Sequence, residues 1–528
     1  MPNTLITINE PFEDMVVGRN GTLSYIVAAL ELGQDVYIHN LPKNPTPSQA
    51  FPSDPNAQVP AIRITADSSW AKELVAAYKS ENKEYLAVVV GELEKQKANP
   101  QYPFGTELLK IAKQQVKHGR DLTQLQSVNI PLREVNFMVQ RLEPMKAPFP
   151  PEGVEDFDVA LTNMQSALPG LVFSAPIGIS DKENLQINKD LKRLGREEIA
   201  TPTTEFTLDG DFMAAFEPMF AKSVEIFEGS KPRIVLKPKD SAQSCGVCAI
   251  ELDEAGHDLA SLQKMTIEEL SHQAHKFKPG LAAAEMTQMA EILLYAQRIV
   301  TDSAQMAEVG RKTAGEISRD EIREKARELY NGQILAQPFL QGVKRGDIRA
   351  NIIKDEKGNF VVDGYTYRAS ARKEGDHGFT TCYTTGAAVS APIQFLSEKE
   401  QENLAKNTAI LLELLNGDYR EKYRDVREIG VDFVPVGDKA QNVVLGEINH
   451  ACPALGPISE VLKEAVRRIN NPQVDSTYDG GINYAKKAIV AAMAQQRSAG
   501  SAQGGDAKRH RPEKPCSMRN HRSHATFC

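Results

Sequence analysis

Three oxygen-bearing side chains occur close together near the end of the chain. Glu447 and Asn449 are two residues apart in the apolar run VVLGEIN, and Asp432 begins the strand-like run before it. Because side chains alternate along a strand, Glu447 and Asn449 share a face, and an antiparallel neighbour would bring Asp432 to them. Such oxygens suit Mg²⁺, which is commonly held by one or two carboxylates together with substrate phosphates. A polar sheet face without any ligand is the alternative.

Lys237 could bind phosphate. It ends the apolar run RIVLKP, just before the small-residue turn 240–246 (DSAQSCG). A lysine in this place can hold phosphate oxygens as a point charge, and backbone N–H groups of the turn can cradle an anion. An ordinary β-hairpin with a solvated lysine is the alternative.

The segment KRGDIR contains Lys344, Asp347 and Arg349 and follows the apolar run ILAQPFLQG. Asp347 and Arg349 share a strand face. A carboxylate there could accept hydrogen bonds from ribose hydroxyls, and an arginine could clamp a phosphate. A salt-bridged edge strand explains the same residues equally well.

The elements that must position these side chains begin with a strand, a helix and a second strand. Residues 4–8 and 35–39 are β-prone, residues 21–32 have helical periodicity, and Gly33 suits the left-handed position after a helix. This order is typical of an α/β domain with a parallel sheet. Later strands are expected at 135–140, 233–238, 245–252, 331–340, 347–354, 359–368, 432–435 and 443–448. Helices are expected near 70–79 and 104–118, over almost all of 254–329, and at 396–416, 459–468 and 484–495.

The composition is that of a globular protein. The 528 residues include 62 Lys and Arg against 70 Asp and Glu, a formal charge of −8, and residues 495–528 carry +5 of the total. The remaining −13 argues against a nucleic-acid-binding core, and a basic end alone is usually solvated. No apolar run approaches the roughly 18–20 residues of a membrane span, and MPNTLITINE lacks the pattern of an export signal. Six cysteines form no disulfide framework, so a cytoplasmic protein is expected.

Other reactive residue types have simpler explanations. The single Cys245-x-x-Cys248 pair lacks the four ligands of a structural zinc site, and we interpret it as small residues in a sheet. His450 follows the oxygen set and is either structural or a proton-transfer group. The methionines of 276–300 are interpreted as packing residues, with a dimer or partner interface as the alternative.

Taken together and in this order, the lysine, the hinge-like run ILAQPFL, the GDxR strand and the Asp…Glu-x-Asn set resemble ATP-grasp ligases. In that superfamily ATP lies between two antiparallel sheets. The chain is most similar to the prokaryotic glutathione synthetase family, because NEPFEDMVVGRNGTLSYIVAALELGQDVYIHN is similar to its first strand, loop and helix. FMVQRLEPM (137–145) resembles its strand ending in Arg-x-Asp-Pro, with Glu143 in place of the Asp. The resemblance covers most of 1–490 except roughly 51–125 and 254–329.

This resemblance implies a role for each matching residue. It assigns Lys237 and Lys189 to ATP phosphates (with Lys182 as a rival of Lys189), Gln337, Phe339 and Leu340 to adenine, and Asp347 to the ribose side. It also assigns Asp432, Glu447 and Asn449 to Mg²⁺ (or Mn²⁺), Arg349 and Arg368 to the transferred phosphate and the substrate carboxylate, and Arg141 to substrate. The implied reaction phosphorylates the carboxylate of γ-glutamylcysteine with ATP, and the amine of glycine then attacks the acyl phosphate.

Two segments depart from the family pattern. The turn 240–246 keeps one glycine where the family has several, and the loop 374–387 has Thr380, Cys382 and Gly386-Ala387 where the family has Arg-x-Asn and Gly-Gly. Two alternatives therefore stay open. One is a related ATP-grasp peptide ligase with a different amino-acid acceptor, and the other is an ATP-binding protein that has lost ligase activity.

We thus expect an α/β (α+β) protein with a Rossmann-like pre-ATP-grasp domain followed by an ATP-grasp fold. The expected parts are the substrate domain 1–145, a central domain and first ATP-grasp subdomain 146–230, the ATP-grasp domain 231–495 with a helical insertion 254–329, and a disordered basic tail 496–528. The expected partners are small molecules (ATP, a small acidic peptide and an amino acid), with no nucleic acid and no membrane. A homo-oligomer is compatible with the sequence.

Overall fold

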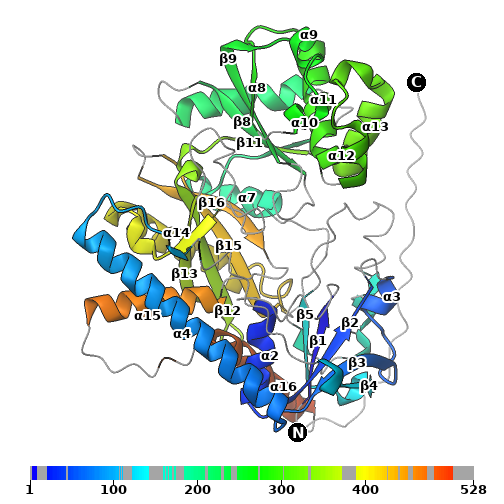
Figure 1. Ribbon diagram of the computed structural model, residues 1–528, viewed down its shortest axis with the longest axis vertical. Helices are drawn as coiled ribbons and strands as arrows, with labels where there is room; N and C mark the ends of the chain where they lie inside the picture. Colours follow the sequence, from blue (N-terminus) through cyan, green and yellow to red (C-terminus); the bar gives the residue numbers. More distant parts are fainter. Residues whose placement is uncertain are drawn as a thin grey trace.

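Figure 1 shows a computed structural model of the chain, in which three β-sheets are joined and covered by helices. The structure describes residues 3–8, 21–42, 46–105, 107–108, 110, 122–141, 159–160, 162–164, 166–168, 172–173, 184–207, 212–226, 231–238, 247–271, 274–300, 303–330, 334–370, 388–424, 426–437, 441–449, 456–471, 478 and 481–503. The mixed α/β class is confirmed.

Several predicted features lie outside the described residues. These are Lys182, the turn 240–246 with Cys245, the loop 374–387, His450 and the tail beyond residue 503. Arg141 is described only as the last residue of its strand.

The N-terminal sheet has six strands, in the order β4 (Gln126–Pro131), β3 (Gln58–Ile64), β2 (Asp35–Asn40), β1 (Asn3–Ile8), β5 (Phe137–Arg141) and β6 (Val172–Phe173). Strands β2, β1, β5 and β6 run parallel to one another. Strand β3 is antiparallel to β2, and β4 is antiparallel to β3. Helix α2 (Gly21–Glu31) connects β1 to β2, and Gly33 has a φ of +71° after it. The predicted βαβ opening is therefore confirmed.

Helix α4 (Ser69–Ala98) is longer than the predicted helix near 70–79. Its apolar positions continue at helical spacing, and Tyr85, Val89 and Leu93 are buried in a cluster with Val461 and Leu462. The additional turns are therefore held by tertiary packing against the C-terminal part of the chain.

The upper five-stranded sheet has the order β10 (Ala274–Phe277), β9 (Cys248–His257), β8 (Arg233–Pro238), β11 (Ile334–Pro338) and β7 (Thr204–Phe206). Only β9 and β10 are parallel among these pairs. Its core is packed by helices α8 (Phe212–Ile226) and α11 (Ala283–Val300). Cys248 is buried there, and burial raises the pKa of its thiol to about 12, which fits an inert residue of the sheet.

The insertion 254–329 is less helical than predicted. Strand β9 runs on to His257, and β10 follows before α11, so that prediction was wrong at these two places. Both strands complete the upper sheet, which gives their backbone groups partners that sequence periodicity cannot reveal. The helices are α9 (Leu259–Leu262), α10 (Ile267–Leu270), α11, α12 (Ser303–Val309) and α13 (Arg319–Tyr330).

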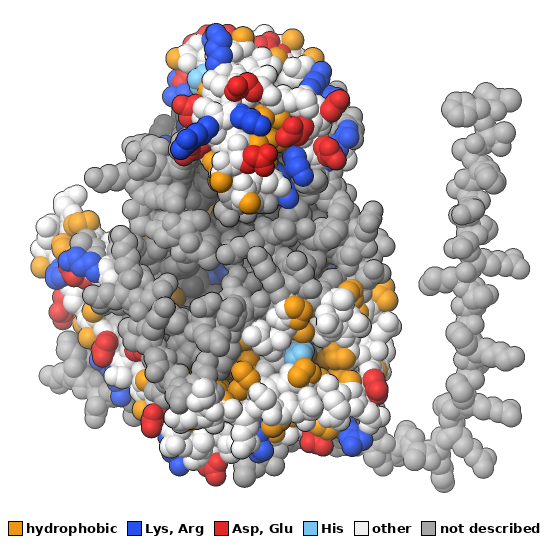
Figure 2. All heavy atoms as spheres, turned by 45° about the vertical axis from the view of Figure 1, so that its right-hand side comes forward, with side chains coloured by type: hydrophobic (Ala, Val, Ile, Leu, Met, Phe, Trp, Pro, Cys, Tyr) orange, Lys and Arg blue, Asp and Glu red, His pale blue; other side chains and the backbone are white. Residues whose placement is uncertain are grey.

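The methionines of the insertion are packing residues, as predicted, since Met286 and Met289 are buried in its core. Figure 2 shows that the exposed face of the insertion in that view mixes positive and negative side chains with scattered hydrophobic ones.

The lower five-stranded sheet is antiparallel throughout, in the order β14 (Ala388–Ala391), β13 (Phe360–Ser370), β12 (Gly346–Lys354), β15 (Glu428–Pro435) and β16 (Val443–Asn449). Helices α7 (Asn184–Arg193) and α14 (Glu398–Asn416) share its core. The helix α3 (Pro47–Ala50) and the 3-10 helices Leu122–Gln124, Leu132–Glu134, Glu197–Ile199, Ala314–Glu316, Gln341–Lys344 and Ile393–Phe395 complete the described elements. Because β12 lies in the centre of the sheet, the predicted edge-strand alternative for KRGDIR was wrong.

Helices α15 (Gly456–Asn470) and α16 (Asn483–Gln503) join the lower sheet to the N-terminal sheet and its helices. The buried carboxylate of Glu428 accepts hydrogen bonds from Tyr25 of α2 and Tyr484 of α16. The helix extends past the predicted start of the tail at 496, because Ala and Gln residues continue it. No helix in the described ranges is long and apolar enough to cross a membrane.

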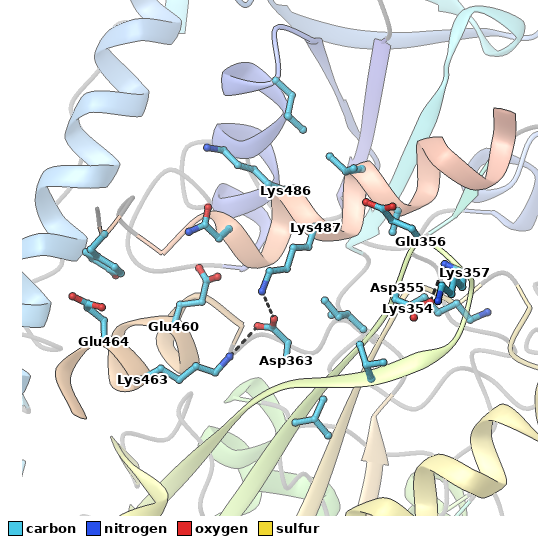
Figure 3. Close-up of a pocket in the computed structure, with 18 of the residues that line it drawn as sticks. Lys354, Asp355, Glu356, Lys357, Asp363, Glu460, Lys463, Glu464, Lys486 and Lys487 are labelled. Carbon is cyan, nitrogen blue, oxygen red and sulfur yellow. Dashed lines mark hydrogen bonds and ion pairs between the residues drawn. The ribbon is translucent and has the colours of Figure 1, made fainter. Parts of the chain in front are cut away.

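Two carboxyl groups, the buried Asp363 and the half-buried Glu460, lie close together where α15 faces β13 (Figure 3). The side chain of Asp363 is 4% exposed and forms ion pairs with Lys487 Nζ at 2.7 Å and Lys463 Nζ at 3.6 Å. Burial raises the pKa of nearby Glu460, and the charge of Asp363 raises it further, to about 7. The charges of Lys487 and Lys463 and the backbone N–H of Asn483 oppose this rise without cancelling it.

The raised pKa of Glu460 should make stability depend on pH. Its ordinary pKa is 4.5, so above that value the folded state keeps a proton that the unfolded chain has lost. The free energy of unfolding should therefore fall by up to about 3 kcal/mol as the pH rises from the unfolded pKa through the folded one. In the Glu460→Gln variant, urea unfolding at about pH 5 and about pH 8 should no longer show this fall in the free energy of unfolding. The exposed control Glu402→Gln should keep this pH dependence. If Glu460→Gln also kept the pH dependence of the wild type, the raised pKa of Glu460 would not be its cause.

Candidate functional site

A cavity lies between the upper and lower five-stranded sheets. It is lined by Thr201, Val235, Lys237, Val247, Gln337, Pro338, Phe339, Leu340, Val343, Asp347, Asp432, Val434, Gly446 and Glu447. Seven side chains that the sequence predicted for one site are among them, namely Lys237, Gln337, Phe339, Leu340, Asp347, Asp432 and Glu447. Residues as distant in the chain as Lys237 and Glu447 are therefore brought together by the two sheets.

The end of β11 gives the cavity an apolar wall with one fixed amide. Gln337 Nε2 donates to Thr203 Oγ1 at 2.8 Å, which holds the amide in place. The backbone N–H of Phe339 donates to Arg233 O at 2.9 Å, and the Arg233 guanidinium lies 4.7 Å from the Phe339 ring centroid. Leu340 is buried against Val444. This rigid apolar slot can accommodate a flat ring.

Lys237 enters the same cavity from the upper sheet. It lies on β8 opposite Leu335 of β11, and Val235, two residues earlier, lines the same cavity. The half-buried lysine therefore places a positive charge next to the apolar slot, facing the acidic residues of the lower sheet.

Four buried charges form a chain of ion pairs across three strands of the lower sheet. Arg349 holds both carboxylate oxygens of Asp432, with Nη2 to Oδ2 at 2.7 Å. Arg368 holds Asp347, with Nε to Oδ1 at 2.5 Å, and its Nη2 also reaches Asp432 Oδ1 at 3.0 Å. The pairs are direct cross-strand neighbours, since Asp347 faces Arg368 and Arg349 faces Asp432 in the strand registers.

The ionic state of Asp432 follows from this arrangement. Burial acts to raise the pKa of Asp432, but the charges of Arg349 and Arg368 and their hydrogen bonds outweigh it and hold that pKa below its ordinary value. Asp432 is therefore a carboxylate at neutral pH, and it can act as a ligand for a cation or an acceptor for cationic side chains.

The predicted metal set has a suitable donor arrangement. Asp432 and Glu447 face each other across β15 and β16, and Asn449 Nδ2 donates to Asp432 Oδ2 at 3.1 Å. Among the described residues no three His, Cys, Asp or Glu side chains gather around one point. Two carboxylates and an amide nevertheless fit Mg²⁺, because this ion takes few protein ligands when phosphates supply the others.

The remaining predicted residues lie outside the cavity lining. Arg349, Arg368 and Asn449 adjoin it through Asp432. Lys189 is exposed on α7 and does not line the cavity, and neither does Lys344. The roles of Lys189 and Arg141 stay predictions, as do the roles of the residues that line the cavity.

Three glycines that were not among the predicted site residues, Gly342, Gly346 and Gly446, shape this site. A Cβ atom on Gly446 would lie 2.8 Å from Val434 Cγ2, and one on Gly342 would lie 2.0 Å from Pro435 O. Gly346 has a φ of +146°, and a Cβ there would lie 2.2 Å from Arg368 O. The two glycines that flank Lys344 thus allow close approach of neighbouring strands beside Asp347. The repeated glycines of QGVKRGD were the available signal.

Comparisons with protein-family models and with curated protein sequences find no match. Among solved structures, the chain is similar to a D-cycloserine synthetase (16% identity over 68% of this chain and 84% of the other, TM-score 0.35). It is also similar to D-alanyl-alanine synthetase A from Vibrio cholerae (11%, 92% and 99%, TM-score 0.38) and to a biotin carboxylase from Campylobacter jejuni (12%, 92% and 70%, TM-score 0.38). Similarities this weak do not support an activity.

Proposed function

We propose that this protein is an ATP- and Mg²⁺-dependent carboxylate–amine ligase of the ATP-grasp type. The observation that carries the proposal is the cavity between two sheets, to which one sheet contributes Lys237 and the other contributes Asp347, Asp432 and Glu447. A cation opposite carboxylates, next to an apolar slot, suits a nucleotide whose phosphates are shared with a metal ion.

In this proposal adenine occupies the slot formed by Gln337, Phe339 and Leu340. The cavity has a volume of about 170 Å³, which is smaller than the roughly 300–1,000 Å³ of sites that enclose a whole drug-sized ligand. The ribose and phosphates would therefore extend past Asp347 and Lys237 toward Arg349 and Arg368.

Asp432, Glu447 and Asn449 would hold Mg²⁺. When bound, the ion neutralises phosphate charge and polarises the transferred phosphoryl group. Lys237 binds phosphate oxygens as a point charge. Arg349 and Arg368, which are paired with Asp432 and Asp347, supply planar donors that match phosphate and carboxylate oxygens.

The proposed reaction has two steps. A substrate carboxylate oxygen attacks the γ-phosphorus of ATP, so that ADP leaves and an acyl phosphate forms. The nitrogen of an amine then attacks the acyl carbon, phosphate leaves, and the amine loses a proton. We propose γ-glutamylcysteine as the acid and glycine as the amine, because the opening residues and FMVQRLEPM resemble the glutathione synthetase family.

The test is an assay with Mg²⁺, ATP, γ-glutamylcysteine and glycine that follows ADP and glutathione together. We expect both products in equal amounts. ADP formation only with a different amino acid would favour a related ligase with another acceptor. Nucleotide binding without turnover for any acceptor would favour an ATP-binding protein that has lost ligation, and the absence of nucleotide binding would refute the proposal.

A further inference from the structure

A second, larger cavity lies at the other end of β12. It has a volume of about 1110 Å³ and is formed by the β12–β13 turn, α15, α16 and Leu32 at the end of α2 (Figure 3). We refer to it as the basal groove. Asp347 lies near the start of β12 and Lys354 at its end, so about 20 Å of strand separates the groove from the cavity proposed for ATP. The two cavities share no lining residue.

Opposite charges are interleaved along the basal groove. Asp363 lies between Lys463 and Lys487, and Figure 3 shows both lysines directed toward it. Arg467 pairs with Glu464 on the same wall, with Nε to Oε2 at 2.8 Å. A ligand of a single sign would meet like charges in any position here, whereas a ligand with both signs could pair along the whole groove.

Three polar atoms of the groove have no hydrogen-bond partner in the part of the chain that the structure describes. They are Asp363 Oδ2, Glu460 Oε2 and the hydroxyl oxygen of Tyr478, and all three atoms are buried. Buried polar atoms of this kind are costly unless something satisfies them. An ammonium group, with three N–H donors, can donate to all three oxygens.

The groove also contains apolar surface. Val361 of β13 and Val490 of α16 line it, with 37% and 40% of their surface exposed. The volume exceeds what a single amino acid needs, and the valines suit the aliphatic parts of a longer molecule.

We propose that the basal groove binds a short peptide as a zwitterion. Its ammonium group lies on Asp363, Glu460 and Tyr478, and its carboxylates lie on Lys463, Lys487 and Arg467. The peptide is of the class that the proposed reaction uses and makes, so the inference rests on the proposed function for the identity of its ligand. The distance from the ATP cavity makes the groove a binding site separate from the proposed active site.

Hydrogen exchange of the full chain tests the proposal without nucleotide or turnover. Glutathione is the zwitterionic probe, succinate the anionic control and putrescine the cationic control. Of the three ligands, we expect only glutathione to slow exchange in α15, α16 and the β12–β13 turn. The variant Lys463→Met/Lys487→Met should raise the glutathione concentration needed for half-maximal protection about tenfold, because two ion pairs to half-exposed lysines are lost.

Val490→Glu provides a second variant that removes no buried partner, since it adds a carboxylate to an exposed position of the groove. It should also weaken protection by glutathione, while Glu447→Gln in the other cavity should leave it unchanged. Three outcomes would overturn the proposal. Succinate or putrescine could protect as well as glutathione, glutathione could fail to protect α15 and α16, or both groove variants could keep full protection. Because no ATP is present, loss of ligase activity and loss of groove binding are separate results.

Discussion

Exchanging Glu447 for glutamine is expected to slow ATP-dependent turnover by about 100- to 1,000-fold. Glu447 lines the cavity and lies across from Asp432, so it supplies one of two carboxylates in the proposed metal set. Glutamine keeps the size and one oxygen ligand but removes the charge, which weakens attraction for a divalent cation. In a titration with Mg²⁺ at fixed ATP, followed by ADP release, the midpoint should also move to higher Mg²⁺ concentration.

A direct binding measurement separates the metal from the nucleotide. Calorimetry of ATP binding without Mg²⁺ should give similar affinities for the wild type and Glu447→Gln, and the same added concentration of Mg²⁺ should strengthen ATP binding more in the wild type than in the variant. Glu402→Gln is the matched control, because it makes the same chemical change on an exposed side chain of α14. Full activity in Glu447→Gln, with an unshifted Mg²⁺ midpoint, would show that the metal assignment is wrong.

Arg368→Met is expected to lower the free energy of unfolding by about 3–5 kcal/mol. Arg368 contacts both Asp347 and Asp432, and all three side chains are buried. Methionine keeps much of the packing volume but leaves Asp347 as a buried carboxylate without its cation. Urea unfolding measures the effect through the shift of the midpoint at constant slope.

Two comparisons make this result specific. Arg193→Met removes an ion pair with Asp418 whose side chains are 60% and 55% exposed, so it should change stability by less than about 1 kcal/mol. The double variant Arg368→Met/Asp347→Asn should recover part of the loss, because the uncompensated carboxylate is gone. If Arg368→Met were no more destabilising than Arg193→Met, the buried network would not contribute to stability as described.

The sequence predicted β12, β13 and β16 of the lower sheet well because their signal is local, whereas β15 begins four residues before the predicted start and β14 was not predicted. Alternation along β12 and β16 and the turn between β15 and β16 are properties of short segments, and the register Asp432 to Glu447 agrees with the predicted antiparallel pair. Boundaries that depend on distant packing were less predictable. The extra turns of α4 are held by α15, and β9 and β10 are held by the upper sheet.

For the residues of the cavity too, some features follow from local sequence and others only from tertiary packing. The sequence alone determined the residue types and their shared faces, namely a strand-end lysine, a GDxR strand and a Glu-x-Asn pair, because these depend on spacing of a few residues. Only the tertiary structure decided that Arg349 pairs with Asp432 and Arg368 with Asp347, since this follows from the strand order β13, β12, β15. It also decided that charges of α15, α16 and β13 meet in the basal groove, because these elements are separated along the chain. Contacts of this kind join residues far apart in sequence, and their geometry is set by how sheets and helices pack, which no local pattern encodes.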